Sequence, residues 1–396
     1  MPKVNGEILK WARKTAQLSL EDAARKIAIK DSKGLTAGEK LSLYEESKKD
    51  PSRSLLIRMS KQYHRPIITF YLKDTPRKAD RGEDFRTLPA NIDPSKDANV
   101  DALLREIKTR QSIIKEALLE QDEGDEIDFI GMIGQKADIF KSAELIKNTI
   151  AFDPLVFRDQ KNHTTAFSYL REKVEESGVY VILKGNLGSH HTEIDVQLFR
   201  GFALADKVAP FIVINDRDAS SAWSFTLLHE LAHIFMGQTG VSAGNKFDNN
   251  IEKKCNDIAS EILVPSKEFN SFRLKSNRFN EIANEISDYA NKRKVSSTHI
   301  SYRLYKRGDI DQPEWIKLRD FYREKWLYER NKRKERSRSK EGGPNYYVVK
   351  RHKLGSLVNV ARRFADSGAL TTTEAGMLLD VRPIKVHKIF ETTKIA

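Results

Sequence analysis

The chain of 396 residues is poor in cysteine and has no long apolar run. Its single cysteine, Cys255, excludes an internal disulfide framework and is typical of proteins in a reducing compartment. A membrane span would need about 18 uninterrupted apolar residues, and no such run occurs. The N-terminal residues MPKVNGEILKWARK also lack the apolar core of a signal peptide. These absences predict a soluble, cytoplasmic protein with no membrane partner.

Basic residues outnumber acidic ones in this chain. It holds 69 Lys and Arg against 56 Asp and Glu, which gives a formal net charge of +13 and a sequence pI near 9.4. This balance makes an acidic partner such as nucleic acid a candidate, although charge alone does not establish binding. The hydrophobic content of 39% is sufficient for folded cores, and the length exceeds that of one ordinary core. We therefore expect about two or three domains.

Apolar periodicity predicts an α+β fold with helices at both ends of the chain. Short amphipathic helices are predicted in the N-terminal part, where Ser19 and Thr36 are suitable caps. Three β-rich runs, YVILKG, EIDVQLFRGFALA and PFIVIND, predict a small sheet at roughly 178–216. The predicted segments are an all-α bundle at 1–75, a linker with helices at 76–147, an α+β domain at 148–275, a helical region with a basic linker at 276–340 and a C-terminal helical domain at 341–396.

Two features near the C-terminus have no assigned role at this stage. The basic stretch ERNKRKERSRSKEGGPN, which begins at Glu329, has the composition of a mobile linker or of a nucleic-acid contact. Beyond it, two helical stripes are separated by a turn that contains Gly368. This pattern does not distinguish a second recognition device from a lid.

The motif HELAH at 229–233 carries the clearest chemistry. Residues four apart share one face of an α-helix, so His229 and His233 can present two imidazoles to one metal ion. Glu230 projects about 100° away around the helix, where it can act on water without being a ligand. This arrangement suits metal-assisted hydrolysis of a peptide bond, with Glu230 as the general base.

Chance is the alternative explanation of this motif. A chain with nine His contains an HExxH string by accident in roughly a few cases per hundred. Three observations favour the metal site: the motif lies in an amphipathic segment, a strand-rich block precedes it, and Gly237 and Gly240 end the helical pattern just after it.

A catalytic zinc site needs a third protein ligand, which must come from outside the motif. The next predicted helix offers Glu252, Asp257 and Glu261 beside its apolar stripe, and helical geometry does not choose among them. For each of them a solvated surface carboxylate is the alternative. Cys255 could ligate zinc through its thiolate, but its place in the apolar stripe favours a small core residue.

Three other residues have competing interpretations. His190 and His191, in GSHHTEID, either line the substrate cleft and donate to the oxyanion or lie in an exposed turn, and the turn is favoured. Tyr180, in VYVI, is expected to be a core residue.

The segment HELAHIFMG followed by EKKCNDIASEILVP resembles the ImmA/IrrE family of metallopeptidases. In that family a second helix follows the HExxH helix and ends in a Leu-Met-Pro-like turn, which corresponds here to Leu263, Val264 and Pro265. The resemblance implies a zincin-like domain at 148–275, Zn²⁺ as the cofactor and Glu252, just ahead of Asn256, as the third ligand.

The N-terminal segment YEESKKDPSRSLLIRMSKQYHRPIITFYL resembles an Xre-type, phage-repressor-like helix-turn-helix. The stretch IKDSKGLTAGEK stands where such a motif usually has a tight turn. The resemblance implies a DNA-binding domain at 1–75, and the candidate contacts to DNA phosphates are Lys48, Lys49, Arg53 and Arg58. A solvated charged face is the alternative for these four residues.

Taken together, the residues and the resemblance predict a zinc-dependent endopeptidase coupled to a DNA-binding-like domain. The expected partner is a protein substrate, such as a repressor or a toxin, with DNA as a further candidate. The alternative is a DNA-binding transcriptional regulator, or the antitoxin of a toxin–antitoxin pair, with little or no proteolysis.

Overall fold

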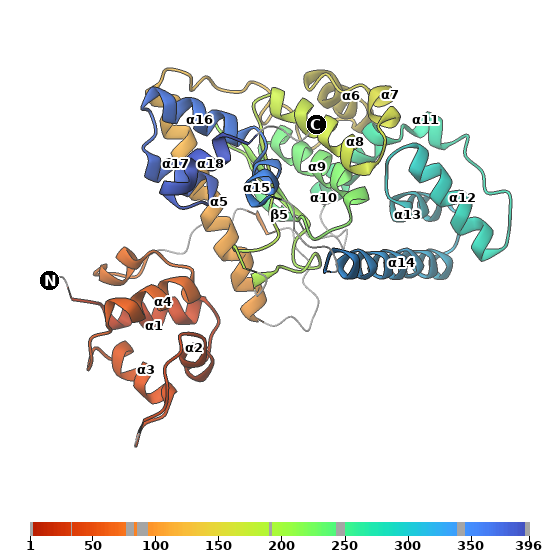
Figure 1. The fold of residues 1–396 in the computed structure, drawn as a ribbon. Coiled ribbons are helices and arrows are strands. Elements are labelled where there is room, and N and C mark those ends of the chain that lie inside the picture. The colour runs from red at the N-terminus through yellow and green to blue at the C-terminus, as the bar shows by residue number, and fades with distance from the viewer. Residues whose placement is uncertain are drawn as a thin grey trace. The chain divides into compact units, whose positions relative to one another are not determined.

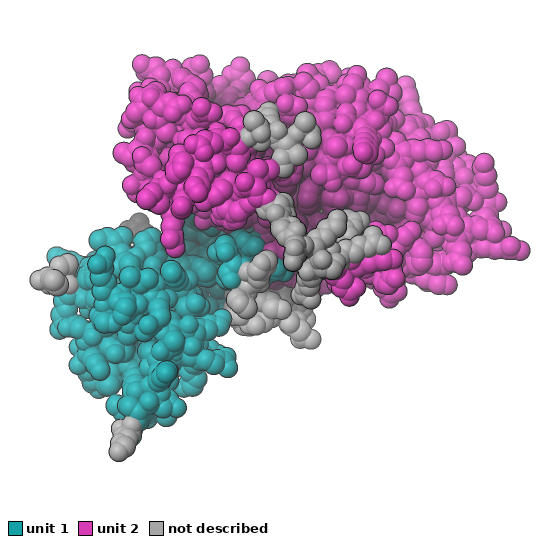
Figure 2. Space-filling model, in the orientation of Figure 1, with its two compact units in different colours: residues 1–81, 88–106, 186–194 teal, residues 82–87, 107–185, 195–396 magenta. Residues whose placement is uncertain are grey.

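The computed structural model describes residues 3–32, 34–76, 83–84, 94–189, 192–242, 250–338 and 345–392. The chain divides into two compact units, which Figure 2 shows in different colours. Unit 1 comprises residues 1–81, 88–106 and 186–194, and unit 2 comprises residues 82–87, 107–185 and 195–396.

Unit 1 contains the predicted N-terminal helices around one apolar core. Ser19 and Thr36 cap α2 and α3 as expected, because each side chain accepts a hydrogen bond from the third helical backbone amide. Residues 27–36 separate these two helices, so the connection is long, as the sequence indicated. The helices are α1 (Gly6–Thr15), α2 (Leu20–Lys26), α3 (Ala37–Glu45), α4 (Arg53–Tyr63), the short 3-10 helix η1 (Ile67–Tyr71) and the first part of α5 (Pro94–Glu120).

Unit 2 is α+β and is built on one mixed sheet. Its strands are β1 (Glu83–Asp84), β2 (Tyr180–Leu183), β3 (Gly201–Leu204), β4 (Phe211–Ile214) and β5 (Gly240–Ser242), in the order β1-β5-β3-β4-β2. β3 is antiparallel to both of its neighbours, whereas β2 pairs with β4 and β1 with β5 in parallel. The residues of β2, β3 and β4 are all buried, which explains why these strands appear in the sequence as continuous apolar runs.

The sheet is larger than the sequence predicted. The strands β2, β3 and β4 lie within the predicted range, but β5 and β1 lie outside it. The first half of the run EIDVQLFRGFALA forms a turn instead of a strand, because Asp195 accepts a hydrogen bond from the amide of Gln197 and bends the chain. The strand β5 is three residues long and contains a glycine, so it has no clear strand pattern.

Helix α9 (Ser220–Phe235) packs on β3 and β4, and α8 and α10 pack against α9 (Figure 1). In the predicted linker at 76–147, helices occur at Pro94–Glu120 and from Ile139 onward, and most of residues 76–93 lies outside the described residues. The remaining helices of unit 2 are α6 (Ile139–Thr149), α7 (Pro154–Asp159), α8 (His163–Glu176), α10 (Asn250–Leu263), α11 (Ser266–Phe269), α12 (Phe279–Lys292), α13 (Ser297–Arg307), α14 (Gln312–Arg338), α15 (Tyr346–Leu354), α16 (Leu357–Ser367), α17 (Thr372–Leu379), the 3-10 helix η3 (Pro383–Lys385) and α18 (Val386–Phe390).

Helix α14 extends into the predicted basic linker. It includes the basic stretch as far as Arg338, and residues 339–344 lie outside the described residues. Lys, Arg and Glu are good helix formers, and neither Gly nor Pro occurs before Gly342 in this stretch. The absence of an apolar stripe therefore did not prevent a helix from forming.

Among the helices of the described residues, none has both the length and the apolar character needed to cross a membrane.

Candidate metal centre

Helix α9 presents both histidines of the HELAH motif on one side. His229 and His233 are one turn apart, and each side chain is buried. Their Nε2 atoms lie 3.2 Å from each other. The helical spacing read from the sequence therefore brings two imidazole nitrogens to one point.

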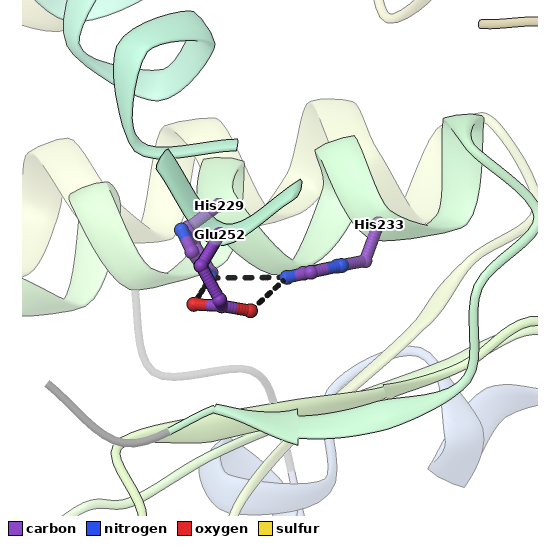
Figure 3. A group of neighbouring side chains, drawn as sticks. All are labelled: His229, His233 and Glu252. Carbon is purple, nitrogen blue, oxygen red and sulfur yellow. Dashed lines mark hydrogen bonds and ion pairs between the residues drawn. The ribbon is translucent and has the colours of Figure 1, made fainter. Parts of the chain in front are cut away.

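Helix α10 supplies a carboxylate to the same point. Glu252 lies in the first turn of α10, and Figure 3 shows its carboxylate beside both imidazole rings. One carboxylate oxygen is 2.8 Å from Nε2 of His233 and the other is 3.2 Å from Nε2 of His229. These three residues are a buried group whose ligand atoms lie within 4.8 Å of one another. Among the described residues, these three side chains are the group that could hold a metal ion.

The spacing of the donor atoms fits zinc. Zinc binds imidazole nitrogen and carboxylate oxygen at about 2.0–2.2 Å in a tetrahedral arrangement, which places neighbouring ligand atoms about 3.3 Å apart. The separations of 2.8 and 3.2 Å between these donors are close to that value. Two nitrogens and one oxygen also match the donor set of catalytic zinc sites, which keep the fourth position open.

The electrostatics of the group favour a charged carboxylate. Burial alone would raise the pKa of Glu252, but the charge of His229 and hydrogen bonds from both histidines lower it below its usual value. Burial lowers the pKa of His233, despite its contact with Glu252. At His229 burial acts in the same direction, but the hydrogen bond and the charge of Glu252 outweigh it and raise the pKa. Glu252 is therefore a charged carboxylate in a buried place, and a carboxylate in this form can ligate a cation.

Two neighbours orient the imidazoles. His229 forms a side-chain hydrogen bond with Asn256, one turn after Glu252 on α10. Nδ1 of His233 lies 3.4 Å from Oε1 of Gln238, so a proton on Nδ1 would leave the lone pair of Nε2 available to a metal ion. Outer partners of this kind fix the ring orientation of metal-binding histidines.

Glu230 is fully buried on α9 and is not part of the metal-ligand group. Its side chain lies against Gly201 of β3: a Cβ atom at Gly201 would be 2.8 Å from Oε1 and 2.9 Å from Cγ of Glu230. This glycine lets the strand approach the helix so closely that Glu230 fits between them. The position agrees with a carboxylate that acts beside the metal without ligating it.

The other carboxylates of α10 point elsewhere. The Glu261 side chain accepts hydrogen bonds from the backbone amide and the hydroxyl of Ser266, where it stabilises the start of the next helix. Asp257 lies near Lys253, Arg303 and Lys306. Neither is in the group that could hold a metal ion.

Two of the remaining candidates are core residues. The prediction that Cys255 is a core residue is confirmed, since it is fully buried, its Sγ lies 3.8 Å from Sδ of Met236, and burial raises its thiol pKa. Tyr180 is likewise a core residue, with its ring 5.0 Å from that of Phe211. His190 and His191 lie outside the described residues.

The four basic residues proposed to contact DNA are all exposed in unit 1. Lys48 and Lys49 follow the end of α3, and Arg53 and Arg58 lie on α4. Lys48 forms a 2.7 Å ion pair with Glu46, and Nζ of Lys49 lies 5.8 Å from the centre of the Tyr44 ring. Their exposure leaves them able to meet phosphates, and their role stays a prediction.

Sequence reasoning did not identify Gly201 or Gln238 as parts of this site. Gly201 had a recognisable signal, because a glycine within an apolar strand often marks a close approach of another element. Gln238 lies beyond the end of α9, and only the path of the chain after the helix brings it to His233.

Comparison with known proteins gives one family match, in the central part of the chain. No curated protein and no solved structure matches the chain. Residues 174–305, which are about one third of the chain and contain all the proposed site residues of unit 2, match the family model Peptidase_M78, the IrrE N-terminal-like domain. This match supports a metallopeptidase-like domain of the ImmA/IrrE family, whose members are generally zinc-dependent, in the central part of the chain.

Proposed function

We propose that this protein is a zinc-dependent endopeptidase that cleaves a regulatory protein such as a repressor. The observation that carries the proposal is the convergence of His229, His233 and Glu252, with Glu230 buried beside them. In this proposal the first three residues hold one zinc ion, and Glu230 is the general base.

Bound zinc would polarise the scissile carbonyl group and make a water molecule more acidic. Glu230 takes a proton from the attacking water as its oxygen adds to the carbonyl carbon. The C–N bond then breaks, and Glu230 returns the proton to the leaving amine nitrogen. Gly201 keeps this carboxylate in place, while Asn256 and Gln238 hold the two imidazoles in orientation.

Metal content and cleavage, measured on matched variants, test the proposal. We expect about one zinc per chain in the wild type and in Glu230→Gln, with cleavage of a partner protein only in the wild type. His229→Ala should lose both zinc and cleavage. Candidate substrates are the proteins encoded by neighbouring genes.

Two outcomes would contradict the proposal. Wild-type protein without zinc would remove the cofactor, and full zinc content in His229→Ala would place the metal elsewhere. Zinc without cleavage of any candidate would favour the second function.

The second candidate function is a DNA-binding regulator or an antitoxin with little or no proteolysis. The exposed basic residues of unit 1 and the net charge of +13 favour it. Salt separates the two functions, because phosphate contacts weaken steeply as ionic strength rises whereas peptide hydrolysis at a buried site does not. A scaffold would require the histidines but not Glu230, so the presence of this carboxylate favours the enzyme.

A further inference from the structure

The C-terminal helices form a small bundle that the metal centre does not use. Helix α16 packs against both α17 and α18, and α17 also packs against η3 and α18. The helical residues from Pro383 to Phe390 follow one another without a gap. The buried side chains of this bundle are Leu357, Val358, Ala361, Phe364, Leu370, Ala375, Leu378, Leu379, Val386 and Ile389.

A tight turn joins the last two helical segments of this bundle. Asp380 ends α17 in the left-handed conformation, with φ of 51°, and the amide of Val381 donates a 2.9 Å hydrogen bond to the carbonyl of Gly376. A Cβ atom at Gly376 would lie 2.9 Å from the oxygen of Val381 and 3.2 Å from the nitrogen of Pro383, so a small residue is needed there. Two helices joined by a turn of about three or four residues, with a third helix across them, are the arrangement of a helix-turn-helix.

We propose that residues 372–390 are a C-terminal helix-turn-helix that binds duplex DNA. The segment from Pro383 to Phe390 is the element that enters the major groove. This site uses none of the residues of the metal centre or of the N-terminal helices, and it does not depend on the proposed peptidase function.

The outer face of the second helical segment carries the appropriate charge. From Val381 to Phe390 the sequence contains no acidic residue. Arg382 and Lys388 are exposed, and Lys385 is partly exposed, while Val386 and Ile389 point into the bundle and are buried. The segment therefore has a basic side directed to solvent and an apolar side directed to its own core.

An exposed apolar residue and a group of hydroxyls complete this surface. Ile384 is 74% exposed at the start of the second segment, although it is a large apolar side chain. In a major groove, an apolar side chain at this position can contact the methyl group of thymine. Thr372 and Thr373 are exposed at the start of α17, and hydroxyls at the N-terminus of this helix are suited to DNA phosphates. A major groove about 12 Å wide admits one α-helix, which makes duplex DNA the partner that fits this shape.

Ion pairs of Asp380 hold the turn against the rest of unit 2. The Asp380 carboxylate is 2.5 Å from Nζ of Lys350 on α15 and 3.2 Å from Nζ of Lys184, which follows β2. These ion pairs fix the turn to the rest of unit 2. The basic side of the second segment remains exposed, so the surface that would meet DNA is already formed.

Charge reversal in the full-length protein tests this site. The triple variant Arg382→Glu, Lys385→Glu and Lys388→Glu is compared with the wild type by fluorescence anisotropy, using labelled duplex DNA of random sequence over a series of salt concentrations. We expect the affinity to fall about tenfold or more. The dependence of log affinity on log salt should become shallower by about one for each DNA phosphate that the variant no longer neutralises.

The matched control removes the same charge elsewhere in unit 2. Lys267, Lys275 and Lys292 are exposed, and their triple change to Glu lowers the net charge equally. A general charge effect would weaken both triple variants alike, which would overturn the proposal. Near wild-type binding by the control and weak binding by the C-terminal variant would support it. Unchanged zinc content and thermal stability show that both variants are folded.

The N-terminal basic residues are a second possible source of DNA binding, so they are reversed in a third variant, at Lys48, Lys49 and Arg53. Loss of binding in this variant alone, with wild-type affinity in the C-terminal variant, would overturn the proposal. Equal affinity for the unannealed single strand would also overturn it, because a single strand has no major groove. Failure of the peptidase proposal would leave the DNA-binding results unaffected, with thermal stability as the check on folding.

Discussion

At the scale of single residues, the site depends on three ligand side chains from two helices and on one glycine that leaves space for the general base. His229 and His233 reach the same point because they are four residues apart on one helix. Glu252 reaches it from another helix, and Gly201 allows Glu230 to fit against a strand. Each contribution can be removed alone: loss of a ligand should remove the metal, and loss of the glycine should impair catalysis.

Removal of the third ligand should release the metal ion. We expect Glu252→Ala to lose zinc on dialysis, because two imidazoles alone leave the ion with fewer than three protein ligands. The matched control is Glu261→Ala, on the same helix, whose carboxylate bonds to Ser266 instead. Elemental analysis distinguishes the two, and zinc loss in the control with retention in Glu252→Ala would show that the wrong carboxylate was assigned.

A larger residue at position 201 should displace the general base, which would reduce catalysis without releasing the metal ion. In Gly201→Ala the new methyl group would lie 2.8 Å from Oε1 of Glu230, so the carboxylate or the strand must shift. We expect cleavage to be lost while zinc remains, together with destabilisation of about 1–3 kcal/mol from overpacking. Gly134→Ala is the control, since nothing lies within 4 Å of a Cβ atom there. Full activity in Gly201→Ala would mean that this contact does not position Glu230.

At the scale of secondary structure elements, the carboxylate of Asp380 joins the C-terminal helices to the sheet domain. Burial would raise the pKa of this carboxyl, but the charges of Lys184 and Lys350 lower it below its usual value. A carboxyl whose pKa is lower in the folded state contributes stability above its unfolded pKa, and that contribution is lost as the pH falls through the folded value.

The Asp380→Asn variant measures this contribution. Asn also tolerates the left-handed conformation of this turn, so the backbone should be preserved. We expect its Tm to be a few degrees below that of the wild type at neutral pH. The difference should shrink below about pH 4, where the carboxyl of the unfolded wild type becomes protonated before that of the folded protein. Thermal unfolding at a series of pH values checks this, and a difference that does not depend on pH would show that the ion pairs contribute nothing.

At the scale of the whole molecule, the two compact units have separate cores and separate polar supports. Unit 1 contains a buried ion pair in which Nε and Nη2 of Arg13 lie 2.6 and 2.9 Å from the two carboxylate oxygens of Glu45. Both side chains are less than a tenth exposed. Breaking such a pair typically costs about 3–5 kcal/mol, because one buried charge is left uncompensated.

This pair provides a test of the division into units. We expect Glu45→Ala to lower the stability of unit 1 by that amount and to leave the amide hydrogen exchange of α9 and α10 unchanged. Removal of zinc with a chelator should have the opposite effect, with faster exchange in α9 and α10 and no change in α1 to α4. Glu7→Ala, at an exposed position of α1, is the control for unit 1. Parallel changes in both units after either treatment would show that they unfold as one.

Local patterns were sufficient for much of this protein. The caps at Ser19 and Thr36, the helix that carries HELAH and the buried strands all follow from interactions between residues close in sequence, so spacing and residue type indicate them. The strand β5 and the helical part of the basic stretch were harder to predict from the sequence, because short strands and charged helices have weak periodic signals.

The sequence by itself determined which residues are able to bind a metal and how two of them share a helical face. Only the tertiary structure decided which carboxylate of α10 meets them, because the direction of Glu252, Asp257 and Glu261 depends on how α10 rotates as it packs against α9. A resemblance to a known family selected Glu252, and the packing of the two helices brings that residue, and neither of the other two, to His229 and His233.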